Sequence, residues 1–313
     1  MGSPAMTPPE EMLMVTGASG RLGQLVLREL IERQGVDPMK IVAITRTPDR
    51  VNFWKERGVV VRRGDFNDEP LILREAFKGG RRALIIAPDD LNNRRKNIEN
   101  AIREAVEAGV DHILFTGVVT QPKDLPPFMG DLLEIEENVL HEIKDKKGIT
   151  YTVLGFNLWM ETHMDFLRGE IALGTLCTTT PNGKVAFISR EDYARACAAA
   201  LASTKEMRDK YELTGPEAMD RHQLATAISN AMGFPKPLEV RHVAQGDLID
   251  RLGAEGMPNP TAHFWVEHIE RTINNGGLAT VNSGFFDLTG MKPETFEAFV
   301  KRSREIYAPM PKM

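Results

Sequence analysis

The sequence predicts an α/β fold, in which a doubly wound parallel sheet of the Rossmann type is joined by a smaller α+β C-terminal lobe. Over the first half of the chain, short apolar, β-rich runs alternate with longer amphipathic stretches. A glycine-rich turn directly follows the first of these runs. After residue 154 this regular alternation gives way to a pattern that indicates short helices, turns and a short strand. Together these observations indicate βαβ units followed by a second lobe.

Six continuous β-rich runs indicate strands that are buried on both faces of the sheet. They cover residues 12–16, 40–45, 59–62, 83–87, 112–116 and 150–154. Between them, apolar residues recur at helical spacing, for example over 22–31 and 98–106. With right-handed crossovers, the ligand crevice lies beyond the carboxyl ends of the strands, so we expect functional residues directly after strands.

The later part of the chain predicts a helix over about 190–203, a short strand at 211–214 and a helix that begins after Asp220. Glycines and prolines interrupt the remaining residues and mark loops between short helices. We therefore expect a tag or disordered tail over residues 1–10, a Rossmann domain over 11–155 and a smaller substrate-binding lobe over 156–313. Some segments of this lobe are expected to return to the first domain.

The amino-acid composition and net charge exclude several classes of function. The 313 residues are 42% hydrophobic and 27% charged, as in an ordinary globular chain. The net charge of −5 offers no basic field for a nucleic acid, and we interpret the run Arg94-Arg95-Lys96 as a solvated face. No apolar run reaches the roughly 18 residues of a membrane span, and no secretory signal opens the chain. We expect a cytoplasmic protein that acts on a small molecule, and leave assembly into a homo-oligomer open.

No metal site is predicted. Cys177 and Cys197 form no CxxC pair, so neither a zinc site nor a redox motif is indicated. His263 and Glu267 share a face of a predicted helix, where an exposed i,i+4 pair is the expected arrangement.

The strongest local motif is TGASGRLG over residues 16–23, between the first strand and the first helix. Gly17 permits the tight turn, Gly20 lets the backbone approach a pyrophosphate, and Gly23 lets helix and strand pack closely. The alternative is a purely structural glycine turn. We expect a dinucleotide to contact Gly17, Ser19, Gly20, Arg21, Leu22 and Gly23.

The end of the second strand indicates which dinucleotide binds. An acidic residue there would accept a hydrogen bond from a free ribose 2′-hydroxyl, but the sequence is Ala43-Ile44-Thr45-Arg46-Thr47-Pro48. Arg46 suits a 2′-phosphate, with Arg21 or Arg50 in support, so NADPH is favoured over NADH. The alternative is a solvent-exposed arginine that opens a helix.

Residues after three further strands complete the expected cofactor site. Asp65 and Phe66 follow the third strand and would lie at the adenine, although Asp65 also suits a helix N-cap. Ala87 and Pro88 after the fourth strand, and Gly117 with Val118 after the fifth, should border the ribose and nicotinamide. Of these, Val118 is expected to face the substrate.

Taken together, TGASGRLG, AITRTP, RRGDFND and AGVDHILFTG resemble the NmrA-like atypical short-chain dehydrogenases. The later stretches 183–194 and 211–216 also fit, so the resemblance covers about residues 12–300. It is greatest to the branch of NADPH-dependent quinone oxidoreductases and triphenylmethane reductases. The resemblance implies a Rossmann domain with a small lobe, NADP(H) as cofactor and a substrate cleft between the two. The family includes both reductases and catalytically silent NADP(H) sensors.

The acid motif of ordinary short-chain dehydrogenases, Tyr-x-x-x-Lys, is absent, because none of the four tyrosines has a lysine four positions later. Asn138 stands where many relatives carry a lysine. We therefore expect an NADPH-dependent reductase of conjugated acceptors such as a quinone, an activated enone or a delocalised cation. A non-catalytic NADP(H) sensor that binds a protein partner is the alternative, and no residue is assigned as catalytic.

The substrate is expected near the segment that follows the sixth strand. Phe156 and Trp159 would stack on an aromatic acceptor, with Asn157 or His163 donating a hydrogen bond. The alternative for these side chains is plain core packing. Phe264 and Trp265 in the C-terminal lobe either cap the cleft or bury against the lobe.

Overall fold

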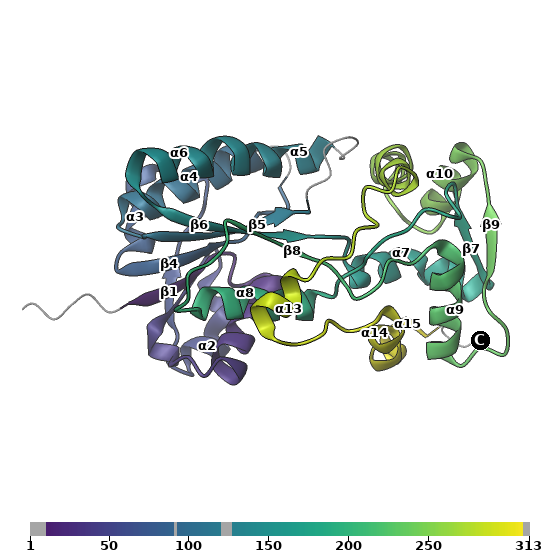
Figure 1. Ribbon diagram of the computed structural model, residues 1–313, viewed down its shortest axis with the longest axis horizontal. Coiled ribbons are helices and arrows are strands. Elements are labelled where there is room, and N and C mark those ends of the chain that lie inside the picture. The colour runs from purple at the N-terminus through teal and green to yellow at the C-terminus, as the bar shows by residue number, and fades with distance from the viewer. Residues whose placement is uncertain (1–10, 91–92, 120–126, 309–313) are drawn as a thin grey trace, which may run out of the picture. The chain divides into compact units, whose positions relative to one another are not determined.

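The computed structural model describes residues 11–90, 93–119 and 127–308 (Figure 1). The expected tail over 1–10 lies outside these residues. The described chain divides into two compact units. The first unit is drawn from Met1–Gly117, Asp131–Leu154 and Ala194–Tyr211, and the second from Val118–Gly130, Gly155–Tyr193 and Glu212–Met313.

A seven-stranded sheet in the order β3-β2-β1-β4-β5-β6-β8 confirms the predicted Rossmann-like fold. Its strands are β1 (Met12–Val15), β2 (Ile41–Thr45), β3 (Val60–Arg63), β4 (Gly80–Ile85), β5 (His112–Val118), β6 (Thr150–Phe156) and β8 (Lys210–Leu213). Parallel pairing joins β1 to β2 and β4, β2 to β3, and β4 to β5. Val15 is in register with both Ala43 and Leu84, so the carboxyl ends of the three central strands are aligned.

Helices cover both faces of this sheet. Figure 1 shows α3, α4 and α6 on one face, and α2 and α8 on the other. The helices of this part of the chain are α1 (Arg21–Arg28), η1 (Glu29–Arg33), η2 (Pro38–Lys40), η3 (Pro48–Val51), α2 (Asn52–Lys55), α3 (Pro70–Phe77), α4 (Arg94–Glu107), α5 (Pro127–Glu134), η4 (Ile135–Leu140), α6 (His141–Lys147) and α8 (Arg190–Ala202). All of β2 is buried, as a strand covered on both faces requires.

The last strand of the sheet comes from a later part of the chain. The strand predicted at 211–214 is β8, which extends the first sheet beside β6. The backbone N–H of Val153 donates to Asp209 O at 2.8 Å, and the Thr152 hydroxyl donates to Arg208 O at 3.0 Å. Such pairing between distant segments has no local sequence signal.

The second unit has a core of its own beneath short helices and a parallel pair of strands, β7 (Thr175–Thr178) and β9 (Glu239–His242), which the sequence did not predict. Its helices are α7 (Met160–Leu173), α9 (Arg221–Met232), α10 (Gln245–Ala254), α11 (Asn259–Phe264), η5 (Trp265–Glu270), α12 (Arg271–Asn274), α13 (Gly284–Thr289), α14 (Phe296–Arg302) and α15 (Arg304–Tyr307). As predicted, α9 begins after Asp220, whose carboxylate forms a capping box with Gln223.

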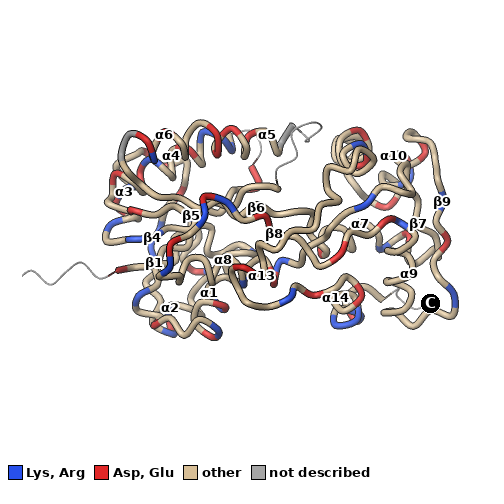
Figure 2. The backbone as a smooth tube through the Cα atoms, viewed as in Figure 1, with Lys and Arg blue, Asp and Glu red and all other residues tan. Residues whose placement is uncertain are grey.

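Charges of both signs are interspersed along the helices and loops of each unit (Figure 2). Arg94 was expected to lie on a solvated face, but its side chain is buried. Its Nη2 lies 3.4 Å from Asp131 Oδ2. His263 and Glu267 form the expected exposed pair, at 3.1 Å. In the described part of the chain, no helix is long and apolar enough to cross a membrane.

Candidate functional site

The turn between β1 and α1 has the geometry that its glycines predict. Gly17 has a φ of +59°, in the left-handed region that favours glycine. A Cβ atom added at Gly23 would lie 2.4 Å from Gly17 O and 2.7 Å from Ala18 Cα. Both of these neighbours are backbone atoms, so any side chain at position 23 would push the helix away from the turn.

The N-terminus of α1 is suited to an anion. Gly20 is its N-cap and offers no side chain to the first N–H groups, and the first turn holds no acidic residue. The first N–H groups of a helix have no acceptor within the helix and carry partial positive charge. Backbone groups of Arg21, Leu22 and Gly23 can therefore bind a pyrophosphate without displacing a protein acceptor.

Three hydroxyl groups meet where the end of β2 faces the glycine-rich turn. Thr45 Oγ1 and Thr47 Oγ1 lie 2.8 Å and 3.1 Å from Ser19 Oγ. Arg21 and Arg46 are both exposed, and within the described residues neither guanidinium has a hydrogen-bond or ion-pair partner. Cationic and hydroxyl donors without a carboxylate among them suit a phosphate group. Sequence reasoning named Ser19 but missed the two threonines.

Asp65 does not cap a helix, so the helix N-cap that the sequence suggested for it is wrong. Its Oδ1 accepts hydrogen bonds from both the backbone N and Nδ2 of Asn67, each at 3.0 Å, within the loop that follows β3. The next helix, α3, begins only at Pro70. Phe66 is half-buried, and its carbonyl accepts from Asn100 Nδ2 at 2.9 Å. The loop is thus tied to α4, with Phe66 at the carboxyl end of β3.

The end of β4 is joined to β5 through the side chain of Thr116. Ala87 N donates to Thr116 Oγ1 at 2.9 Å, which places Ala87 and Pro88 just beyond β4. Gly117 and Val118 lie within β5 and are buried, whereas the sequence placed them after the strand. A Cβ at Gly117 would lie 2.5 Å from Val153 Cγ1, so close packing against β6 explains this glycine.

In the second unit, the aromatic residues expected near the substrate form a stack. The rings of Phe156 and Trp159 are 4.7 Å apart and inclined by 14°, and both are half-buried. Tyr193 packs edge-on against both, and the Arg190 guanidinium lies 5.8 Å above the Trp159 ring. This is a pair of nearly parallel rings supported by Tyr193, with a cation over the Trp159 ring.

Asn157 is not placed to donate a hydrogen bond to a substrate. Its side chain is 1% exposed, and Nδ2 donates to Leu278 O at 3.0 Å. Its Oδ1 accepts from Leu158 N at 2.7 Å. Both polar atoms of the amide therefore hold backbone segments of the lobe, which contradicts the donor role expected from the sequence.

His163 belongs to the core of the second unit. Its Nε2 lies 3.0 Å from Arg221 Nη1, and its ring packs 4.6 Å from Phe187. Burial, and then the charge of Arg221, hold the pKa of His163 well below its ordinary value. Because Arg221 has only donors to offer, the neutral imidazole accepts at Nε2. His163 is therefore not suited to supply a proton.

Phe264 and Trp265 both pack, half-buried, against the core of the second unit. The Trp265 ring meets Phe166 edge-on at 4.9 Å, and the Phe264 ring lies 5.2 Å from His268. Of the two arrangements that the sequence left open, these contacts favour burial against the lobe for both side chains.

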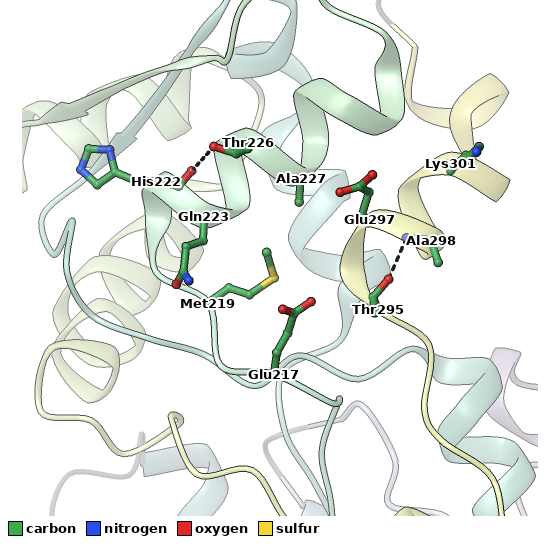
Figure 3. A pocket seen from close by; sticks show the side chains of 10 residues that line it. All are labelled: Glu217, Met219, His222, Gln223, Thr226, Ala227, Thr295, Glu297, Ala298 and Lys301. Atoms are coloured by element: carbon green, nitrogen blue, oxygen red, sulfur yellow. Dashed lines mark hydrogen bonds between the residues drawn. The ribbon is translucent and has the colours of Figure 1, made fainter.

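A surface groove of about 620 Å³ lies in the second unit between α9 and α14. Figure 3 shows Met219 at its centre with the Glu217 carboxylate beside it, while His222 and Lys301 point outward. None of the predicted site residues lines this groove.

Comparison with known proteins agrees with this fold. The NmrA-like family pattern matches residues 9–299. Quinone oxidoreductase 2 of Escherichia coli is 28% identical over 267 residues, which are 85% of this chain and 90% of that protein.

Two solved structures share the fold over nearly their full length. Citrobacter sp. triphenylmethane reductase complexed with NADP(H) has a TM-score of 0.82 at 26% identity, covering 93% of this chain and 99% of the other. An NADPH-dependent quinone oxidoreductase from Escherichia coli, complexed with NADPH, has a TM-score of 0.83 at 26% identity with the same coverage.

Proposed function

Since this chain belongs to the NmrA-like family, we propose that it is an NADPH-dependent oxidoreductase that reduces a conjugated, aromatic or quinonoid acceptor. The observation that carries the proposal is the meeting of the glycine-rich turn with the hydroxyl groups of Ser19, Thr45 and Thr47, which Arg46 adjoins. Two relatives named for quinone and triphenylmethane reduction, each solved with the dinucleotide, support the same assignment.

The residues of the first unit fit the cofactor. The close approach at Gly23 leaves no room for a side chain, and the N-terminus of α1 offers backbone donors for the pyrophosphate. Arg46 and Arg21, with Ser19, would hold the 2′-phosphate, and Phe66 would lie at the adenine. A bound NADPH supplies a hydride, and a reduced quinone takes its proton from water.

The aromatic pair Phe156 and Trp159 would orient the acceptor. Phe156 ends β6 and Trp159 lies just beyond it, and residues that follow a strand are where ligands of such folds commonly bind. Neither donor that the sequence named after β6 is suited to supply a proton, because the Asn157 amide does not ionise and His163 is buried and held neutral beside Arg221. Proximity and orientation, rather than proton donation, would then favour acceptors that delocalise the incoming charge.

The cofactor assignment is tested by calorimetric titration of NADPH and NADH. We expect NADPH to bind more tightly, and Arg46→Ala to weaken it by about 1–3 kcal/mol, as for a charge-assisted hydrogen bond. Arg241→Ala removes an exposed arginine of β9, paired with Glu239, and serves as a control without effect. Equal affinity for the two dinucleotides would overturn the 2′-phosphate argument.

The reaction is tested by following NADPH oxidation with quinones, enones, triphenylmethane dyes and simple ketones. Activity confined to the conjugated acceptors is expected. Preference for simple ketones would reveal a proton donor and contradict the proposed chemistry. Tight NADPH binding with no turnover of any acceptor would favour the NADP(H) sensor instead.

A further inference from the structure

We infer that Thr47, together with Thr45, is a positioning residue that directs the Ser19 hydroxyl to the 2′-phosphate and so sharpens the choice of NADPH over NADH. This inference rests on the proposed function and concerns how its cofactor is selected. The contacts are short: Thr45 Oγ1 and Thr47 Oγ1 lie 2.8 Å and 3.1 Å from Ser19 Oγ.

The direction of the first bond follows from the surroundings of Thr45. Its side chain is 2% exposed, and Oγ1 already accepts the backbone N–H of Thr47 at 3.1 Å. A hydroxyl has one hydrogen to donate, and for Thr45 the acceptor is Ser19 Oγ. The end of β2 therefore fixes the orientation of the group that meets the glycine-rich turn.

The three hydroxyl groups have one hydrogen more than the contacts between them use. Three hydroxyl groups carry three hydrogens, and the two contacts between them use two. In the inferred arrangement Thr45 and Thr47 both donate to Ser19, and the remaining hydrogen is then on Ser19, for which no acceptor is found among the described residues. Its oxygen receives two hydrogens, which favours donation from its own hydroxyl through hydrogen-bond cooperativity.

The chemistry that this donor suits is a phosphate. Arg46 stands between the two threonines in the sequence, and Arg21 is two residues beyond Ser19, so each of the two segments that meet at the cluster carries an exposed cation. A carboxylate at this place would accept a hydrogen bond from a ribose hydroxyl, whereas an outward-directed hydroxyl donates one to a phosphate oxygen. The threonines thus act on specificity through Ser19.

Thr47→Val tests this role because valine keeps the shape of threonine and removes its hydroxyl, and the exposed position of Thr47 leaves the core intact. Calorimetry would compare adenosine 2′,5′-bisphosphate with adenosine 5′-monophosphate. We expect the affinity for the bisphosphate to fall about two- to tenfold, as for one neutral hydrogen bond, with no change for the monophosphate. Thr47→Ser should restore the affinity, and Thr226→Val, on the surface of α9, is the matched control.

A double-mutant cycle with Ser19→Ala separates positioning from direct contact. If Thr47 acts through Ser19, Thr47→Val has no further effect once Ser19 is alanine. An undiminished effect of Thr47→Val in that background, or equal losses for both nucleotides, would overturn the inference. If Thr47→Val has no effect while Arg46→Ala abolishes the preference, the inference fails alone. If the unaltered chain binds both nucleotides equally, the cofactor proposal fails with it.

Discussion

Arg221 and Glu270 form an ion pair inside the second unit, with 3.0 Å between Arg221 Nη2 and Glu270 Oε1 and side chains that are 8% and 1% exposed. The second carboxylate oxygen accepts from Thr178 Oγ1, Thr179 N, Thr179 Oγ1 and Thr180 Oγ1. Burial alone would raise the pKa of Glu270, but the charge of Arg221 and the threonine donors outweigh it and lower that pKa. The start of α9, the end of β7 and η5 are thereby held together.

Glu270→Gln should strongly destabilise the protein because it removes the carboxylate that is hydrogen-bonded to the buried Arg221 guanidinium. We expect a loss of about 3–5 kcal/mol in the free energy of unfolding, measured by urea denaturation at pH 7. Glu239→Gln breaks an exposed pair with Arg241 and should leave that free energy unchanged. Equal urea midpoints for the two variants would show that the buried pair contributes nothing.

The same pair predicts a pH dependence. The pKa of Glu270 in the folded state lies below the ordinary carboxyl value of 4.5, so its stabilising effect is fully present above pH 4.5. It is lost as the pH falls through the folded-state pKa. The difference in unfolding free energy between the unaltered chain and Glu270→Gln should therefore narrow below pH 4.5. A difference that stays constant down to about pH 3 would contradict the assigned direction.

The sheet could be predicted because each of its main strands has a local sequence pattern typical of a buried strand. Segments such as β2 are apolar throughout, and the turn from Gly17 to Gly23 follows the rule for a strand that leads into a helix. The pairing of β8 with β6 and of β7 with β9 joins segments far apart in the sequence, so periodicity did not indicate it.

The part of the candidate site that consists of backbone groups could be predicted from the sequence. Glycines that a tight turn requires form a recognisable motif, whereas the role of a side chain depends on neighbours from elsewhere in the chain. Asn157 looked like a free donor until Leu278 was placed beside it, and His163 looked like an acid until burial beside Arg221 was found to keep it neutral. The two threonines at and just after the end of β2 were the available signal for the hydroxyl cluster.

Glu255 should make the protein less stable as the pH rises toward neutrality. Burial, and then the Glu170 carboxylate, raise the pKa of Glu255 to about 7, although Arg251 acts in the opposite direction. Between pH 4.5 and about 7 the folded state therefore holds a proton that the unfolded state has lost, and stability declines across this range.

Glu255→Gln, which cannot ionise, should raise the Tm at pH 8 and leave it nearly unchanged at pH 5. The control is Glu297→Gln, at an exposed carboxylate on α14, which should shift the Tm equally at both pH values. A Tm gain for Glu255→Gln that is as large at pH 5 as at pH 8 would show that packing, not charge, is responsible.

Gly23→Ala should reduce both stability and dinucleotide binding. The added methyl would lie 2.4 Å from Gly17 O, so the helix has to move, at a cost of about 1–3 kcal/mol by the usual range for overpacking. Gly20→Ala is the comparison, because its methyl would lie 3.2 Å from the same oxygen. Thermal unfolding and calorimetry with NADPH would rank the two variants, and a larger loss of stability for Gly20→Ala would contradict the packing argument.

Trp159→Leu should impair the reduction of aromatic acceptors without weakening NADPH. Its ring stacks on Phe156 and meets the edge of Tyr193, so the variant removes a flat surface worth about 0.5–1.5 kcal/mol for an aromatic partner. This corresponds to about a two- to tenfold fall in kcat/KM for a triphenylmethane dye, and Trp159→Phe should recover most of it. Trp265→Leu is the matched control. Because that ring packs on Phe166 and against the core of the second unit, its loss should lower the Tm and leave the ratio of dye to small-quinone activity unchanged. If Trp265→Leu alters that ratio as much as Trp159→Leu, the acceptor does not bind selectively at the Phe156 and Trp159 stack.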